Sequence, residues 1–210
     1  RRGRGGQARG CSPFLLQNGL IGSMILGVAH AVILSWGWRR AGIAFAAGAI
    51  AALAMPPYGL FPALIVSLCA VVWLLDGAAG AGAGKRFGTI RAAAVAGWFW
   101  GFGFFLAGLW WLGAAFLVEA DRFAWAMPLG VVGLPAVLAL FFAFGFVVAR
   151  LVWSGSAWRI LALAFGLGLA EWLRGHLFTG FPWNTLGMAL GQQLWPMQIA
   201  SLIGLWGMTV

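Results

Sequence analysis

Long apolar runs with almost no charged residues dominate this chain, and they limit the folds that it can adopt. Only 8% of its residues are charged, whereas soluble domains carry about 25%, so most of the surface must face an apolar surrounding. Runs 92–118 and 123–149 exceed the about 20 residues with which a helix crosses a bilayer. Shorter runs lie at 41–55, 58–75, 160–170 and 197–210.

We expect these runs to be helices, because an open strand would leave backbone groups unpaired in lipid. None shows the alternation of a membrane barrel strand. The run 41–55 is short for a span, but Trp36, Trp38, Arg39 and Arg40 before it can extend it into the headgroup region. The sequence therefore predicts an all-α integral membrane protein, a polytopic helical bundle of about five complete spans plus a truncated sixth.

The basic residues lie mainly in alternate connections between the runs. If Arg39 and Arg40 are inside, Arg122 and Arg174 lie outside, and seven basic residues lie inside: Arg39, Arg40, Lys85, Arg86, Arg91, Arg150 and Arg159. This asymmetry obeys the rule that cytoplasmic loops are positively charged. It predicts a multi-pass protein of a bacterial inner (plasma) membrane with a cytoplasmic N-terminus. It also assigns the net charge of +9 to loops and not to a nucleic-acid surface.

The same orientation predicts which connections face the periplasm. They are the Pro56-Pro57 turn, the 119–122 loop and the region 171–196.

Residues 1–23 do not fit this charge pattern. They contain Arg1, Arg2, Arg4 and Arg9, which would lie opposite Arg39 and Arg40 if the next apolar stretch spanned the membrane. The sequence does not begin with Met, and Met24 is a candidate start. A signal peptide that is cleaved near residue 31 is the alternative.

We therefore divide the chain into three parts. Residues 1–23 are interpreted as a non-native or upstream segment, and residues 24–40 as an interfacial N-terminal helix on the cytoplasmic face. Residues 41–210 form the transmembrane helical domain.

Glu171 and Arg174 form a charged pair at the end of the apolar run 160–170. Residues three apart on a helix share a face, so the two side chains can pair. An ionisable residue within a span is costly and usually faces the protein interior or a wet cavity. The pair is either a structural anchor of the helix end or part of a functional site, and the residues alone leave both open.

An aromatic loop follows this pair. Gly175, Gly180 and Pro182 interrupt the helix, and Phe181 and Trp183 flank the proline. Such a loop at the outer surface is either a platform for acyl chains or an ordinary interfacial belt, and composition alone favours the belt.

The sequence shows no catalytic constellation of its own. It contains none of the nucleophile-elbow, zinc-protease, phosphate-loop or dinucleotide motifs. His30 and His176 have no neighbours at metal-ligand spacing. Cys11 and Cys69 are far apart, and the single lysine, Lys85, lies in a predicted cytoplasmic loop. We therefore expect no catalytic residue, no metal site and no cofactor in this chain.

Several motifs resemble those of bacterial apolipoprotein N-acyltransferases. The most specific is EWLRG with LFTGFPWN, at 171–175 and 177–184. The others are MPPYGLFP (55–62), GWFWGFGFF with GLWW (97–105, 108–111) and ASLIG (200–204). The resemblance covers residues 24–210 and implies the N-terminal membrane portion of such an enzyme, a fragment that lacks the nitrilase-like domain.

The resemblance also implies an activity. These enzymes transfer an acyl chain from a phospholipid to the N-terminal amine of the lipidated cysteine of apolipoproteins, the last step of lipoprotein maturation. The reaction passes through a thioester on an enzyme cysteine. The implied partners are a phospholipid acyl donor, a diacylglyceryl-apolipoprotein acceptor and the membrane.

The family's catalytic Glu, Lys and Cys lie in the nitrilase-like periplasmic domain, beyond Val210, so this fragment is expected to be inactive. The resemblance implies that Phe181, Pro182 and Trp183 are substrate-cavity residues and that Glu171 and Arg174 support them.

Two other function classes stay open at this point. A transporter or channel subunit would carry ionisable residues inside several spans, and Glu171 with Arg174 is the one such group in the sequence. A structural membrane scaffold would explain the composition but not the specific loop. The gene sequence that follows residue 210 would discriminate, because a nitrilase-type segment there would identify the acyltransferase.

Overall fold

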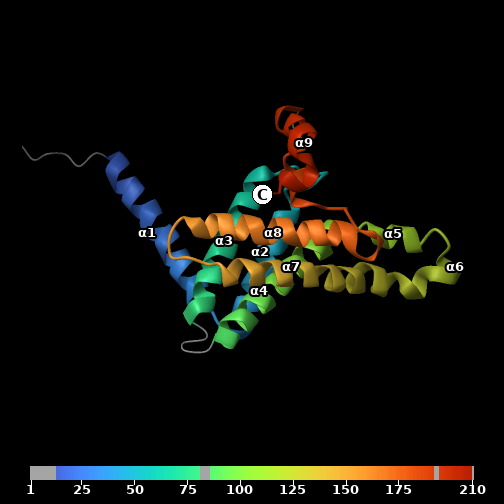
Figure 1. Cartoon of the computed structure of the whole chain (residues 1–210), viewed down its shortest axis with the longest axis horizontal. Helices are drawn as coiled ribbons and strands as arrows, with labels where there is room; N and C mark the ends of the chain where they lie inside the picture. Colours follow the sequence, from blue (N-terminus) through green and yellow to red (C-terminus); the bar gives the residue numbers. More distant parts are fainter. Residues whose placement is uncertain (1–12, 81–85, 192–193, 210) are drawn as a thin grey trace, which may run out of the picture.

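The protein folds as a helical bundle. The computed structural model describes residues 13–80, 86–191 and 194–209, and within these ranges every regular element is a helix (Figure 1). The predicted all-α fold class is confirmed. The main helices are α1 (Pro13–Ile33), α2 (Gly37–Ala52), α3 (Phe61–Gly80), α4 (Arg86–Gly108), α5 (Leu112–Phe116), α6 (Ala120–Phe123), α7 (Leu134–Leu151), α8 (Trp158–His176) and α9 (Leu194–Gly207).

Three helical segments of the described chain are long and apolar enough to cross a membrane. They are Phe61–Ala78, Arg86–Gly108 and Ala120–Leu151, and the last includes α6, the short helices Ala124–Ala126 and Leu129–Gly133, and α7. α2 has 16 residues, and α8 carries Arg159, Glu171 and Arg174 among its 19 residues. The chain is thus a polytopic membrane protein, while the count of five spans plus a sixth stays a prediction.

The apolar run 92–118 is not one continuous helix. α4 ends at Gly108, a bend and turn at Leu109–Trp111 follow, and α5 begins at Leu112. A Cβ atom at Gly108 would overlap the amide of Asn184. The end of α4 therefore lies directly against the aromatic loop after α8, and hydropathy alone could not reveal that break.

α4 lies at the centre of the bundle, packed between α2 and α7, and α7 packs on α8. Glycines allow these close approaches, since Cβ atoms at Gly48 and Gly103 would overlap backbone oxygens of Trp100 and Phe45. Gly97 and Gly101 of α4 face Phe142 of α7 in the same way. Small residues at such close contacts are typical of helices that pack in lipid.

Aromatic rings fill the space between these helices. Trp100, Phe104, Phe105, Phe142 and Phe146 are each at most 1% exposed. The indole Nε1 of Trp100 donates to Ser67 Oγ at 2.9 Å, and that hydroxyl donates to the Ala47 carbonyl at 2.6 Å. The buried polar atoms are thereby satisfied, which a low-dielectric interior requires.

The bundle has two chemically different ends. At one end, which we call the arginine end (Arg40, Asp76, Arg150 and Arg159), Asp76 accepts from Arg159 Nη1 at 2.8 Å and from Trp153 Nε1 at 2.9 Å. At the other, the tryptophan end (Pro56, Trp111 and Trp183), these three residues line one cavity. This grouping matches the predicted alternation of loops. Which side of the membrane each end faces stays a prediction.

α1 lies beside α3 and extends away from the bundle, as Figure 1 shows. It includes residues 24–33 of the predicted interfacial helix, and residues 37–40 belong to α2 instead. The break lies at Gly37, whose φ of 57° suits a residue without a side chain. Of the predicted non-native segment 1–23, residues 1–12 lie outside the described residues, and residues 13–23 belong to α1. The three-part division of the chain stays a prediction.

Candidate functional site

Glu171 and Arg174 form an ion pair that is fully buried near the C-terminal end of α8. Arg174 Nη2 lies 3.2 Å from Glu171 Oε1, and both side chains are 0% exposed. Breaking such a pair leaves an uncompensated buried charge and costs about 3–5 kcal/mol. The predicted pairing is confirmed, and the structure places the pair inside the helical bundle.

Arg174 fixes the aromatic loop to the helix. Its Nη1 donates to the carbonyl of Phe181 at 2.5 Å and to that of Trp183 at 2.6 Å. The Phe181 N–H donates back to the Arg174 carbonyl at 2.9 Å. The two accepting carbonyls flank Pro182, which has no N–H of its own. A guanidinium can hold both because it presents several donors in a rigid plane.

Glycine is required where this loop turns. Gly180 has a φ of 81°, a region that L-residues rarely adopt, and a Cβ atom there would overlap the carbonyl of Gly175. The two glycines that interrupt the sequence motif therefore let the chain return onto its own helix.

Glu171 joins two further segments to α8. Its carboxylate oxygens accept from the Leu186 N–H at 3.2 and 3.3 Å, where the short helix Leu186–Ala189 begins, and from the Thr209 hydroxyl at 3.3 Å. Thr209 Oγ1 in turn accepts from the Gly187 N–H at 3.2 Å. These bonds could not be predicted from the sequence, because the donors are backbone groups and a distant threonine.

The guanidinium is also placed over an aromatic ring. Arg174 Cζ lies 5.1 Å from the ring centroid of Phe105 in α4, within the range of a cation–π interaction. Its Nε has no hydrogen-bond partner among the described residues. The pair is therefore held from three sides, by the loop, by α4 and by the segment around Leu186.

Trp183 lies at the edge of a cavity at the tryptophan end. Its ring stacks on that of Trp111, with centroids 5.2 Å apart and planes at 24°, and Phe181 lies 6.3 Å away. The indole is 51% exposed. The cavity has a volume of about 490 Å³ and is lined by Pro56, Gly108, Leu109, Trp111, Pro182, Trp183, Asn184, Met188 and Leu205.

The structure thus brings together all five residues that the sequence singled out. Pro182 and Trp183 line the cavity, Phe181 packs against the core behind it, and Glu171 with Arg174 holds the loop in place. Sequence reasoning missed Trp111 as a cavity residue. The signal was the Trp110-Trp111 pair, which begins two residues after Gly108, the glycine that ends α4.

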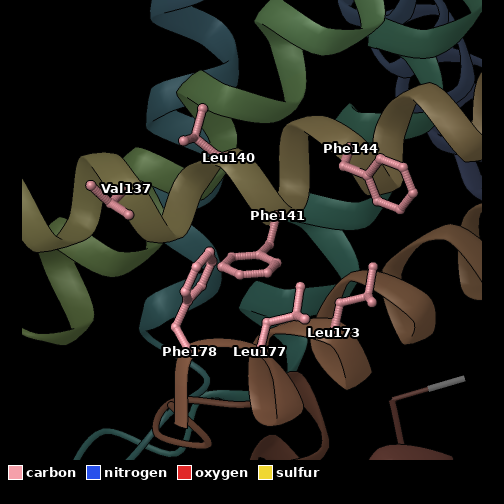
Figure 2. A pocket seen from close by; sticks show the side chains of 7 residues that line it. All are labelled: Val137, Leu140, Phe141, Phe144, Leu173, Leu177 and Phe178. Atoms are coloured by element: carbon pink, nitrogen blue, oxygen red, sulfur yellow. The ribbon is translucent and has the colours of Figure 1, made fainter. Parts of the chain in front are cut away.

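A second apolar groove lies between α7 and α8, close to the same loop. Figure 2 shows the side chains of both helices converging on it, with Phe178 at its rim. Phe178 is 91% exposed and has a φ of 52°. The groove measures about 340 Å³ and is lined by Val137, Leu140, Phe141, Phe144, Leu173, Leu177 and Phe178. Such a lining suits hydrocarbon and contains no group for acid–base or nucleophilic chemistry.

The described residues hold no arrangement for covalent catalysis at either cavity. Cys69 lies on α3 in a different hollow of the surface, and His176 stacks on Trp172 at 4.5 Å. No group of three or more His, Cys, Asp or Glu residues that could bind a metal occurs in the described part of the chain. Cys11 and Lys85 lie outside it. The site therefore consists of a mainly apolar cavity beside a buried polar clamp.

Comparison with known proteins assigns the family. The sequence model of the apolipoprotein N-acyltransferase N-terminal domain matches residues 47–210. Proteins named apolipoprotein N-acyltransferase from Rhodopseudomonas palustris and Rhizobium rhizogenes are each 54% identical, over 87% and 85% of this chain. One from Brucella suis is 53% identical over 89%. The chain spans only 33–35% of the length of these relatives. It belongs to the apolipoprotein N-acyltransferase family, of which it carries the N-terminal domain.

Proposed function

We propose that this chain is the membrane part of an enzyme that moves an acyl chain from a phospholipid to the N-terminal amine of the lipidated cysteine of an apolipoprotein. In this proposal the phospholipid donor and the diacylglyceryl-apolipoprotein acceptor reach the tryptophan end from the bilayer. Nitrilase-type Glu, Lys and Cys outside this chain perform the chemistry. The chain itself forms the wall of the lipid-side cavity and is inactive alone.

One observation carries the proposal: the half-exposed Trp183 is stacked on Trp111 at a cavity whose loop is clamped by a buried arginine. An exposed indole at a membrane interface needs no clamp, because its ring partitions there unaided. A fixed indole beside a hollow of about 490 Å³ instead fits a ligand that must be positioned. The apolar groove between α7 and α8 adds a place for a hydrocarbon chain nearby.

The packing between the two ends argues against a transporter or channel. A transport path would need ionisable residues inside several spans. In the described part of the chain the buried charged side chains are Arg40 at one end and Glu171 with Arg174 at the other. Between them lies a cluster of aromatic rings in contact with one another, those of Trp100, Phe104, Phe142 and Phe146. A structural scaffold would not need the clamped loop.

The test is Trp183→Ala in the full-length enzyme. We expect acyl transfer to fall by about three- to tenfold, since an aromatic pair contributes roughly 0.5–1.5 kcal/mol beyond its buried area. Membrane insertion should stay unchanged, and the unfolding temperature should fall by no more than a few degrees, because the indole lies at the surface of the bundle. The measurement is the rate of acylation of a diacylglyceryl peptide by enzyme in detergent.

Trp158→Ala is the matched control. Trp158 is also exposed, with 71% of its surface accessible against 51% for Trp183, and it begins α8, at the end of that helix opposite the aromatic loop. The Trp158→Ala enzyme should acylate the diacylglyceryl peptide at the wild-type rate. A Trp183→Ala enzyme that also does so would refute the role of this loop in the reaction.

A further inference from the structure

A separate cavity lies at the arginine end, between the start of α2 and the start of α4. It measures about 330 Å³ and is more polar than the hollows at the tryptophan end. It is lined by Ser35, Trp36, Gly37, Arg40, Gly88, Arg91, Ala92 and Val95. None of these residues takes part in the cavity beside Trp183, so the two sites can be tested independently.

Arg40 lines this cavity with a guanidinium that is only partly paired. The side chain is 6% exposed, and its Nη2 donates to the Leu74 carbonyl of α3. Its Nε and Nη1 are buried without a hydrogen-bond partner among the described residues. Unpaired buried donors on a charged group carry an energetic penalty, because they have lost their hydrogen bonds to water. An anion in the cavity would relieve that penalty.

Two helix N-termini converge on the same cavity. α2 begins at Gly37 after Trp36, which forms no side-chain cap hydrogen bond. α4 begins at Arg86, and Gly88 in its first turn lines the cavity. Neither helix has an acidic residue in its first turn. Free backbone N–H groups and the positive end of the helix dipole make such N-termini sites for phosphate groups.

The local charges favour an anion as well. Arg91 lines the cavity and is exposed. Asp76 is the acidic residue of the arginine end, and its two carboxylate oxygens are already bonded to Arg159 and Trp153. The chain has three other acidic residues: Glu119 lies just before α6, Asp121 lies on α6, and Glu171 lies on α8. No carboxylate is therefore left to neutralise Arg40 and Arg91.

We propose that this cavity binds a phosphate group between Arg40, Arg91 and the N-termini of α2 and α4. Basic pockets between membrane helices near the cytoplasmic surface suit anionic lipid headgroups, so phosphatidylglycerol is the first source to test. Soluble phosphate has the same chemistry and is the second source. The inference does not depend on the acyl transfer proposed above.

The experiment titrates the full-length enzyme in neutral detergent with phosphatidylglycerol, with diacylglycerol of the same chains and with inorganic phosphate, and follows binding by native mass spectrometry. Phosphatidylglycerol should bind more tightly than diacylglycerol, which lacks the phosphate. Arg91→Gln should weaken phosphatidylglycerol binding about fivefold, as expected for one basic residue near the membrane surface. Arg91 is exposed, so this variant should fold normally.

The matched control is Arg39→Gln, because Arg39 is exposed on the same helix as Arg40 but does not line the cavity. It should bind like the wild type. Arg40→Lys keeps the charge and should weaken binding while the protein stays folded. Inorganic phosphate that binds with the same arginine dependence would support the site and identify a soluble ligand. Equal binding by the Arg91 and Arg39 variants, or equal binding of diacylglycerol, would overturn the proposal.

Discussion

The side chain of Arg174 connects the buried carboxylate of Glu171 to the aromatic loop at the surface. Nη2 contacts Glu171, and Nη1 holds the carbonyls of Phe181 and Trp183. Lysine could not replace it, because a single ammonium group cannot reach the carboxylate and the carbonyls in the same plane. The clamp thus explains why an arginine is buried so close to an aromatic loop.

Glu171→Gln tests the energetic role of this pair. The substitution removes the charge but keeps the shape, so Arg174 is left buried without a counter-charge. We expect unfolding to become easier by roughly 3–5 kcal/mol, measured by thermal unfolding in detergent. The paired substitution Glu171→Leu with Arg174→Met should recover part of that loss, because it removes both charges.

Glu119→Gln is the control for that prediction. Glu119 and Arg122 have the same spacing along the chain and lie 3.8 Å apart, but their side chains are 60% and 80% exposed. Exposed pairs contribute little, so this variant should unfold at the wild-type temperature. An equal loss in both variants would show that burial of the Glu171 pair is not what matters.

Some residues of the site can be predicted from the sequence, and others cannot. The Glu171–Arg174 pair follows from helical spacing, and the loop follows from its glycines and proline. Leu186 and Thr209, which complete the coordination of Glu171, were unpredictable because the first donates a backbone N–H and the second is 38 residues away. The position of Trp111 beside Trp183 could not be predicted, because it depends on where α4 ends within the apolar run 92–118.

Among the elements, α4 depends most on glycine. On its α2 side, Gly48 and Gly103 let the two backbones touch, and on its α7 side Gly97 and Gly101 admit Phe142. Glycines at such contacts are typical of helices that pack in lipid. The sequence could not predict where α4 ends, because residues 109–118 are as apolar as the span itself and only the contact of Gly108 with Asn184 distinguishes them.

Gly48→Ala should destabilise the α2–α4 contact. A Cβ atom at this position would overlap the Trp100 carbonyl and approach the Phe104 N–H, so the helices must separate. We expect a loss of about 1–3 kcal/mol, as for overpacked cores, measured as a lower unfolding temperature in detergent.

Gly42→Ala on the same helix is the comparison. A Cβ atom at Gly42 would meet nothing within 4 Å, and alanine is the better helix former, so the unfolding temperature should stay equal or rise slightly. A fall of the same size in both variants would show that helix propensity and not the backbone contact determines the outcome.

At the scale of the whole molecule, the described chain gathers most of its basic side chains at one end of the bundle and the Trp111–Trp183 stack at the other. Arg40, Arg150 and Arg159 lie at one end with Asp76, and Trp111 with Trp183 lies at the other. The sequence predicted this alternation from loop charges alone, because the positive-inside rule counts arginines and needs no contacts. It could not predict the two cavities, which form only where separate helices meet.

Cysteine accessibility tests the orientation. In a background in which alanine replaces Cys11 and Cys69, the two cysteines of this chain, Gly155→Cys lies in the loop before α8, where a side chain would meet nothing within 4 Å. Tyr58→Cys lies in the exposed turn before α3. We expect an impermeant thiol reagent added to intact spheroplasts to label the cysteine at position 58 and to leave the one at 155 unlabelled until the membrane is opened. The opposite pattern would invert the assignment of both ends.

The clamp on the aromatic loop also makes the depth of Trp183 in the membrane depend on the thickness of the bilayer. Arg159, which bonds Asp76, and Arg174, which holds the Trp183 carbonyl, are the two polar anchors of α8, about 22 Å apart at the usual helical rise. Because the loop cannot slide along the helix, the depth of the indole follows the position of α8. Hydrophobic mismatch between protein and lipid would therefore set how deeply the platform reaches among the acyl chains.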